Sequence, residues 1–252
     1  MKSFCFNDKY LSQIPALQQL IALRFKYLPP EQAVVERQGK FSNVLLEEFL
    51  RKQLKEINHI QYRGREYLFS EENVQTAIQK LKNITWDGPH KTNEAVYDLL
   101  TLGTALEQSV EDDTKSFTLR YIDWKNWDNN IFHVTAEFRV ERARSDEIAR
   151  PDIVIFVNGI PFAVIECKSP TIEVAQAVSQ CIRNQQDEYI PKLFSFVQLV
   201  MGVNKNAAMY ATAGTARKFW GVWQEMRDRA KDVEASVNNK IQSKVKDTLF
   251  FR

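Results

Sequence analysis

The first part of the chain carries the hydrophobic pattern of amphipathic helices. Apolar residues recur there every three or four positions, which places them on one face of a helix. Two consecutive prolines end the first such stretch, and a serine followed by two glutamates opens the third. The pattern predicts helices over residues 12–28, 42–57, 70–82 and 92–107. We therefore expect residues 1–110 to form a mostly helical region that packs on the rest of the fold.

The pattern changes to alternation further along, which is typical of strands that have one buried face. Strands are predicted over residues 117–124, 131–140, 152–157, 162–168, 194–203 and 207–211, with a helix over 172–189 and a charged helical stretch over 216–245. Asn158-Gly159 between two apolar runs is a strong hairpin signal. Both strands of this hairpin are almost continuously apolar, so we expect helices to cover both of its faces. The predicted fold class is α/β, with a central mixed β-sheet flanked by helices in residues 111–215 and a C-terminal helical extension in 216–252.

Three charged residues interrupt the apolar hairpin, namely Asp152, Glu166 and Lys168. Burying a charge is costly unless the charge is paired or holds a metal. Side chains alternate along a strand, so Glu166 and Lys168 point to the same face, and folding at the Asn158-Gly159 turn brings Asp152 opposite residues 165–167. Two carboxylates held together favour a divalent cation, and hard oxygen ligands suit Mg²⁺. A lysine beside such an ion can orient water and stabilise negative charge, which is suited to cutting phosphodiesters.

These residues also carry a family resemblance. Pro151-Asp152 followed by Glu166-Cys167-Lys168 is similar to the PD-(D/E)xK nuclease motif, and the surrounding segment RPDIVIFVNGIPFAVIECKSP resembles the nuclease segment of the restriction (R, or motor) subunit of type I restriction–modification enzymes. The resemblance extends from the first predicted helices to about Trp223. It includes further residues that match the family: Ile122-Asp123-Trp124, Asn130, Phe132, Gln180, Ile190-Pro191, Leu193-Phe194 and Gly214-Thr215.

The resemblance implies a restriction-endonuclease type of fold and a type I site-specific deoxyribonuclease activity that depends on Mg²⁺. It implies that Asp152 and Glu166 bind the metal, that Lys168 activates the attacking water, and that Gln180 points at the site from the following helix. Asn184 stands where the family has a tyrosine. Related nucleases often add an acidic residue from an early helix, and Glu47 and Glu48 are candidates, although a solvated helix face explains them equally well.

The implied partners are double-stranded DNA and the methyltransferase subunits, which provide modification and specificity. R subunits also carry an ATP-driven translocase after the nuclease, but the phosphate-binding pattern G-x-x-x-x-G-K-[ST] does not occur in this sequence. We therefore expect the chain to be the N-terminal part of a longer subunit, residues 216–252 to lead toward the translocase, and ATP to bind only the full-length subunit.

Composition changes this interpretation little. The chain of 252 residues is 44% hydrophobic and 26% charged, as is usual for a globular protein, and its start resembles no signal peptide. Three cysteines without paired spacing favour reduced thiols in a cytoplasmic protein. The net charge of +2 does not by itself indicate a nucleic-acid-binding protein.

Two alternatives stay open on the sequence alone. One is another PD-(D/E)xK nuclease that acts in repair or cleaves DNA junctions, which a preference for branched DNA would favour. The other is a non-catalytic docking module in which the hairpin is only structural, which a failure to bind any divalent ion would favour.

Overall fold

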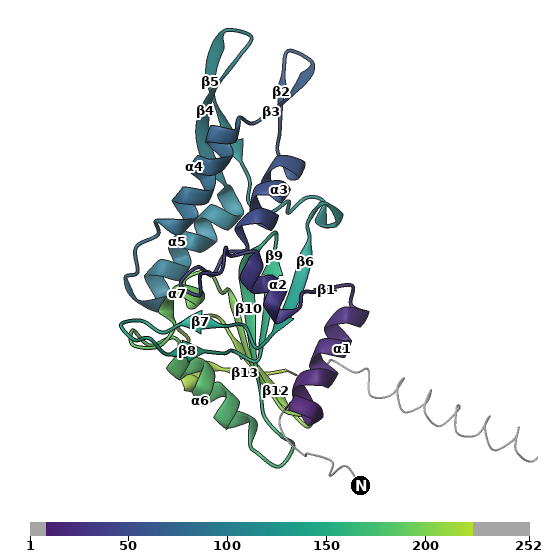
Figure 1. The fold of residues 1–252 in the computed structure, drawn as a ribbon, viewed down its shortest axis with the longest axis vertical. Helices are drawn as coiled ribbons and strands as arrows, with labels where there is room; N and C mark the ends of the chain where they lie inside the picture. The colour runs from purple at the N-terminus through teal and green to yellow at the C-terminus, as the bar shows by residue number, and fades with distance from the viewer. Residues whose placement is uncertain (1–8, 224–252) are drawn as a thin grey trace, which may run out of the picture. The chain divides into compact units, whose positions relative to one another are not determined.

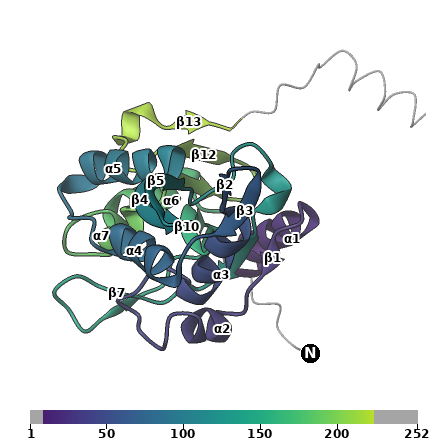
Figure 2. The same ribbon diagram turned by 90° about the horizontal axis from the view of Figure 1, so that it is seen from above.

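The structure, a computed structural model, describes residues 9–223, and the residues up to Val222 belong to one compact unit. A mixed seven-stranded sheet forms its centre (Figure 1). The strands in spatial order are β1 (Lys26–Tyr27), β6 (Phe132–Ala136), β9 (Ile153–Val157), β10 (Ile160–Cys167), β11 (Leu199–Val203), β12 (Ala208–Ala211) and β13 (Gly221–Val222). The β1–β6 and β10–β11 pairs are parallel and the others antiparallel, with β13 at one edge beside β12 (Figure 2).

Seven α-helices surround the sheet within the described part of the chain. They are α1 (Ile14–Ala22), α2 (Pro30–Val35), α3 (Glu47–Ile57), α4 (Glu71–Lys82), α5 (Gly88–Leu102), α6 (Val174–Asn184) and α7 (Pro191–Phe194). Helix α1 continues a short π-helical turn, η1 (Lys9–Gln13), and two 3-10 turns, η2 (Trp127–Asn129) and η3 (Arg217–Phe219), lie in loops. No helix among these is both long and apolar enough to cross a membrane.

Helices α1 and α6 cover opposite faces of the central hairpin. Leu17 of α1 packs in one apolar cluster with Ile165 and Cys167, whereas Val178 of α6 belongs to a second cluster that contains Val164. Figure 1 shows the two helices on different sides of β9 and β10. The expectation that both faces of this hairpin are covered is therefore confirmed.

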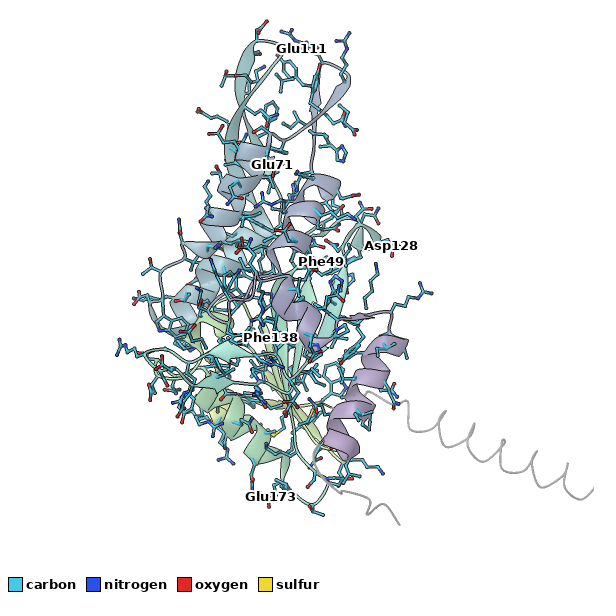
Figure 3. All side chains as sticks on the ribbon, viewed as in Figure 1. Phe49, Glu71, Glu111, Asp128, Phe138 and Glu173 are labelled. Atoms are coloured by element: carbon cyan, nitrogen blue, oxygen red, sulfur yellow. The ribbon has the colours of Figure 1, made fainter. Side chains whose placement is uncertain are left out.

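Three further hairpins lie outside the central sheet. They are β2–β3 (His59–Tyr62 and Arg65–Leu68), β4–β5 (Thr104–Val110 and Asp113–Leu119) and β7–β8 (Val140–Glu141 and Ile148–Ala149). The first two project beyond α3 and α4 (Figure 1). Glu111 marks the tip of one of them, far from Glu173 at the start of α6 (Figure 3).

Several predicted elements are confirmed. Helix α4 begins after Ser70, whose side chain accepts a hydrogen bond from the Asn73 backbone N–H, as a helix cap should. The central hairpin turns at Asn158-Gly159, and β12 matches the strand predicted over 207–211. The mixed sheet with flanking helices confirms the α/β class, whereas the boundaries at 110 and 215 stay predictions.

Other predicted boundaries were wrong, because local periodicity does not show which segments pair. The helix predicted over 92–107 ends at Leu102, since Gly103 has a positive φ of 79° and the next residues pair with β5. That hairpin also moves the strand predicted over 117–124 back to Asp113–Leu119. Residues 42–46 precede α3, residues 26–27 form β1 instead of ending a helix, and the N-terminal region contains β2, β3 and β4 besides its helices.

The later elements are shorter than predicted. Helix α6 covers residues 174–184 of the predicted 172–189, β6 ends at Ala136, and β11 begins only at Leu199 because Phe194 ends α7. The charged stretch predicted as a helix over 216–245 begins with η3 and with β13, which pairs with β12. Residues 224–245 of that stretch lie outside the described residues.

Candidate active site

The central hairpin places the two acidic motif residues opposite each other. Ile153 of β9 pairs with Ile165 of β10, so Asp152, which directly precedes β9, lies opposite Glu166 of β10. The turn at the far end is fixed, because the Asn158 side chain binds the backbone of Tyr121 and Ile131. This anchoring sets the register, and the register decides which side chains share a face.

Helix α6 completes the site from the adjacent strand. Gly202 of β11 is the register partner of Glu166, and a Cβ atom added at Gly202 would lie 2.9 Å from the backbone nitrogen of Val178. The missing side chain therefore lets α6 approach the sheet closely beside Glu166. The approach brings Gln180, on the same helix, within hydrogen-bonding distance of the hairpin.

Hydrogen bonds join Glu166, Lys168 and Gln180 directly, and they attach Asp152 to the Cys167 backbone between two of them. Gln180 donates through Nε2 to Glu166 Oε2 at 2.7 Å and accepts through Oε1 from Lys168 Nζ at 2.6 Å. The Cys167 backbone N–H donates to Asp152 Oδ2 at 2.7 Å. The structure thus brings Asp152, Glu166, Lys168 and Gln180 together on one side of the sheet, and their chemical roles stay predictions.

Burial dominates the electrostatics of the two carboxyl groups. Glu166 is 0% exposed, and burial raises its pKa well above the usual value, with a further rise from the nearby Asp152. Burial also raises the pKa of Asp152, against the opposing effects of the Cys167 N–H and the Lys168 charge. A divalent cation between two such carboxylates would favour their ionised forms.

The donor chemistry of this site fits Mg²⁺. Asp152 and Glu166 offer only oxygen, which is the ligand type that Mg²⁺ prefers, and the ion usually keeps several waters. Among the described residues, no group of three His, Cys, Asp or Glu side chains could hold a metal ion. A ligand set at this site would therefore consist of the two carboxylates, backbone carbonyls and water, as is common for Mg²⁺ but not for structural zinc.

A polar hollow opens beside this group. Its volume is about 380 Å³, and it is lined by Lys168, Gln176, Ser179, Gln180 and Arg183. We call it the site hollow. Two of its lining residues are cationic and none is acidic, so it is suited to a phosphate group next to the buried carboxylates.

The sequence showed Asn184 only as a departure from the family tyrosine, and its contact with the site was not predicted. Asn184 is 5% exposed and donates through Nδ2 to Glu166 Oε1 at 2.9 Å. Both oxygens of Glu166 therefore accept a hydrogen bond from an amide of α6. The spacing could have suggested this, because Asn184 lies four residues after Gln180 and so shares its helical face.

The comparison with known sequence families decides the assignment of the chain. The family described as "Type I restriction enzyme R protein N terminus" matches residues 5–219. The chain belongs to this family.

Three curated type I restriction enzyme subunits are similar to this R protein N-terminal region. The HindI endonuclease subunit of a type I restriction enzyme from Haemophilus influenzae is 25% identical over 94% of this chain and 22% of its own length. A Methanocaldococcus jannaschii protein with a provisional assignment as the MjaIXP endonuclease subunit is 26% identical over 86% of this chain and 20% of its own. The SauCOLORF180P endonuclease subunit of Staphylococcus aureus is 26% identical over 63% of this chain. The chain spans about a fifth of the length of the curated relatives it matches.

The early acidic residues of this R protein N-terminal region lie away from the site. Glu47 pairs with Lys82 at 2.6 Å, and the backbone N–H of Leu46 donates to the Gly159 carbonyl in the hairpin turn. Helix α3 thus packs at the turn end of the hairpin, whereas Asp152 and Glu166 lie at the opposite end. Figure 3 shows Phe49 of α3 well apart from Glu173 at the start of α6. Because α3 packs at the turn end, Glu47 and its neighbour Glu48 do not join the site group.

Asp123 also has a structural explanation. Its carboxylate accepts hydrogen bonds from the backbone N–H groups of Lys125 and Asn126 and from the Asn129 side chain. These bonds lower the pKa of Asp123 and organise the loop before β6. The family match at this position therefore coincides with a turn.

Proposed function

We propose that this domain is the Mg²⁺-dependent DNA endonuclease of a type I restriction enzyme, with a restriction-endonuclease type of fold in the PD-(D/E)xK superfamily. One observation carries the proposal. Asp152 and Glu166 face each other next to the Lys168–Gln180 pair, and the site hollow with its two cationic residues opens beside them. Family membership supports it independently.

Each site residue would have a distinct role in hydrolysis. Asp152 and Glu166 would hold Mg²⁺, together with the Cys167 carbonyl. When bound, the ion supplies positive charge against the negative charge that develops on the scissile phosphate. Lys168 would orient the attacking water, whose oxygen would form the new bond to phosphorus while the bond to the leaving sugar oxygen breaks. The proton that this water loses would pass to solvent, and the leaving sugar oxygen would take up a proton from solvent.

Gln180 is a positioning residue in this scheme. Its amide connects the Lys168 amine to the Glu166 carboxylate, so both groups are held in one orientation. Fixed orientation of catalytic groups before the reaction is a large part of enzymatic rate acceleration.

The same proposal names the partners. The substrate is double-stranded DNA, and the domain reads phosphates, since sequence specificity would belong to the methyltransferase assembly that carries modification and specificity subunits. ATP would bind a translocase elsewhere in the full-length subunit. Unmodified DNA that enters the cell would be cut in the cytoplasm once translocation stalls.

The test is Lys168→Ala in the full-length subunit, assembled with its methyltransferase. Cleavage of supercoiled plasmid should fall ~10²–10⁴-fold, because a charge-stabilising or proton-transferring group typically contributes that much. Triplex displacement, which reports translocation, and ATP turnover should stay near wild type. Lys91→Ala, at an exposed lysine of α5, is the matched control.

Two results would contradict the proposal. Normal cutting by the Lys168→Ala subunit would show that the amine is not part of the chemistry. Loss of translocation together with cutting would show that the residue serves folding or assembly.

A further inference from the structure

The N-terminal segment reaches both halves of the nuclease motif. Ser12 donates through Oγ to the Lys168 carbonyl at 2.6 Å, and Gln13 donates through Nε2 to the Asp152 carbonyl at 2.7 Å. These side chains are 5% and 2% exposed, respectively. Two consecutive residues of η1 therefore hold the backbone at two motif positions that are sixteen residues apart in sequence. We call Ser12 and Gln13 the N-terminal brace.

The brace also contacts a third carboxylate, that of Glu137, which lies near the carboxylate of Asp152. Gln13 Nε2 lies 3.2 Å from Glu137 Oε1, and the Glu137 backbone N–H donates to the Asp152 carbonyl at 3.0 Å. Glu137 follows β6 and has a φ of 50°, a left-handed conformation that is uncommon for residues other than glycine. Its charge contributes to the raised pKa of Asp152. Such backbone strain persists only where surrounding contacts hold it.

We propose that Ser12 and Gln13 are positioning residues that set the affinity of the nuclease site for its divalent cation. The inference rests on the proposed function. The brace fixes the carbonyls of Asp152 and Lys168, and it keeps the Glu137 charge next to Asp152 without placing Glu137 among the ligands. Groups that orient metal ligands typically change metal affinity or activity by ~10–100-fold when they are removed.

The Gln13 amide is not the only contact that attaches α1 to the sheet. Helix α1 is attached to the sheet by Leu17, which packs with Ile153 and Ile165 in an apolar cluster. The Asp152 carbonyl keeps its bond from the Glu137 N–H when the amide is removed. The half-buried Glu137 carboxylate can accept water in place of Gln13. A variant without this donor should therefore fold and still lose the positioning.

The experiment uses Gln13→Met, which keeps the length of the side chain and removes its donor, and Ser12→Ala. Gln19→Met is the matched control, because Gln19 is an exposed glutamine of α1. Binding of Mg²⁺ to the 252-residue chain is measured by isothermal titration calorimetry, together with the ion-induced rise in Tm. The Mg²⁺ concentration for half-maximal plasmid nicking is measured in the assembled full-length subunit.

Both brace variants should bind Mg²⁺ ~10-fold more weakly than wild type, with an unchanged Tm in the absence of the ion and with nicking restored at saturating Mg²⁺. Gln19→Met should match wild type in every measurement. Unchanged Mg²⁺ affinity in both brace variants would overturn the inference, and so would a lower ion-free Tm in both with nicking that Mg²⁺ does not restore. A wild-type chain that binds no divalent ion would overturn the proposed function itself, which separates the two failures.

Discussion

At Glu166, a carboxylate is buried next to a second carboxylate, which is the main energetic cost of this site. Glu166 is fully buried, faces Asp152, and accepts hydrogen bonds on both carboxylate oxygens from Gln180 and Asn184. A buried carboxylate is tolerated only when its charge is compensated, and amide donors favour the charged form. Asn184, which stands where related proteins are expected to have a tyrosine, thus has a defined contact of its own.

Asn184→Ala tests that contact. Removing a donor to the ionised carboxylate should raise the pKa of Glu166 further, so the rise of plasmid cleavage with pH should shift to higher pH. Cleavage near neutral pH should fall ~10-fold, as is typical when a partner of a metal ligand is removed. The measurement is a cleavage–pH profile, with Gln186→Ala, at an exposed amide beyond α6, as the control. A profile that coincides with that of wild type would show that Gln180 alone holds Glu166.

At the scale of elements, the turn of the β9–β10 hairpin sets the register of both strands. The site lies at the opposite end of these strands from the turn. Gly159 has a φ of 84°, and an added Cβ atom would lie 2.6 Å from the Leu46 carbonyl oxygen. Glycine is therefore favoured at this position for two reasons. It adopts the positive φ readily, and it leaves room for the residue that precedes α3. Because the side-chain period of a strand is two, any shift at this turn would move Asp152 and Glu166 out of alignment.

Gly159→Ala should therefore destabilise the fold more than Gly64→Ala. Both glycines have a positive φ, of 84° and 77°, but a Cβ atom at Gly64 would meet nothing within 4 Å. The two variants share the cost of placing a Cβ atom at a positive φ, which is ~1–2 kcal/mol, and Gly159→Ala adds overpacking of ~1–3 kcal/mol. Chemical denaturation of both variants measures the difference in the free energy of unfolding. An equal decrease in the free energy of unfolding of both variants would mean that the contact next to α3 adjusts to the added methyl group at no energetic cost.

For the whole molecule, burial of ionisable groups couples stability to pH. His133 of β6 is buried against Phe49 of α3, with 4.4 Å between the ring centroids, and burial lowers its pKa from 6.5 to about 4. The unfolded chain therefore binds a proton between these values that the folded chain does not. This histidine stabilises the fold fully above pH 6.5 and loses that contribution as pH falls toward about 4.

His133→Phe should make the molecule less sensitive to acid. The phenyl ring keeps the packing against Phe49 and has no group to protonate. Asp152 and Glu166, whose pKa values are raised, act in the opposite direction and are the same in both proteins. Unfolding of wild type and variant is compared at about pH 7 and about pH 4.5, and the wild type should lose more stability between them. Parallel losses would show that His133 is protonated in the folded state.

The sequence by itself determined the central hairpin and the main part of the site. Strand alternation and the Asn158-Gly159 turn are local signals, and together they place Asp152 opposite Glu166 and Lys168 on the same face as Glu166. Family resemblance added Gln180, which the structure places between Glu166 and Lys168. These features could be predicted because each depends on residues close in sequence or joined by one tight turn.

Only the tertiary structure decided the rest. Periodicity could not show that residues 104–110 pair with Asp113–Leu119. A strand is stabilised by its contacts with a neighbouring strand, and these contacts are not visible in the pattern of one segment. It gave no sign that Ser12 and Gln13 meet Lys168 and Asp152, because that contact depends on how α1 packs across the sheet. The same reason removed Glu47 from the site, since α3 packs at the turn end of the hairpin, where Leu46 meets Gly159, while the chemistry lies at the other end.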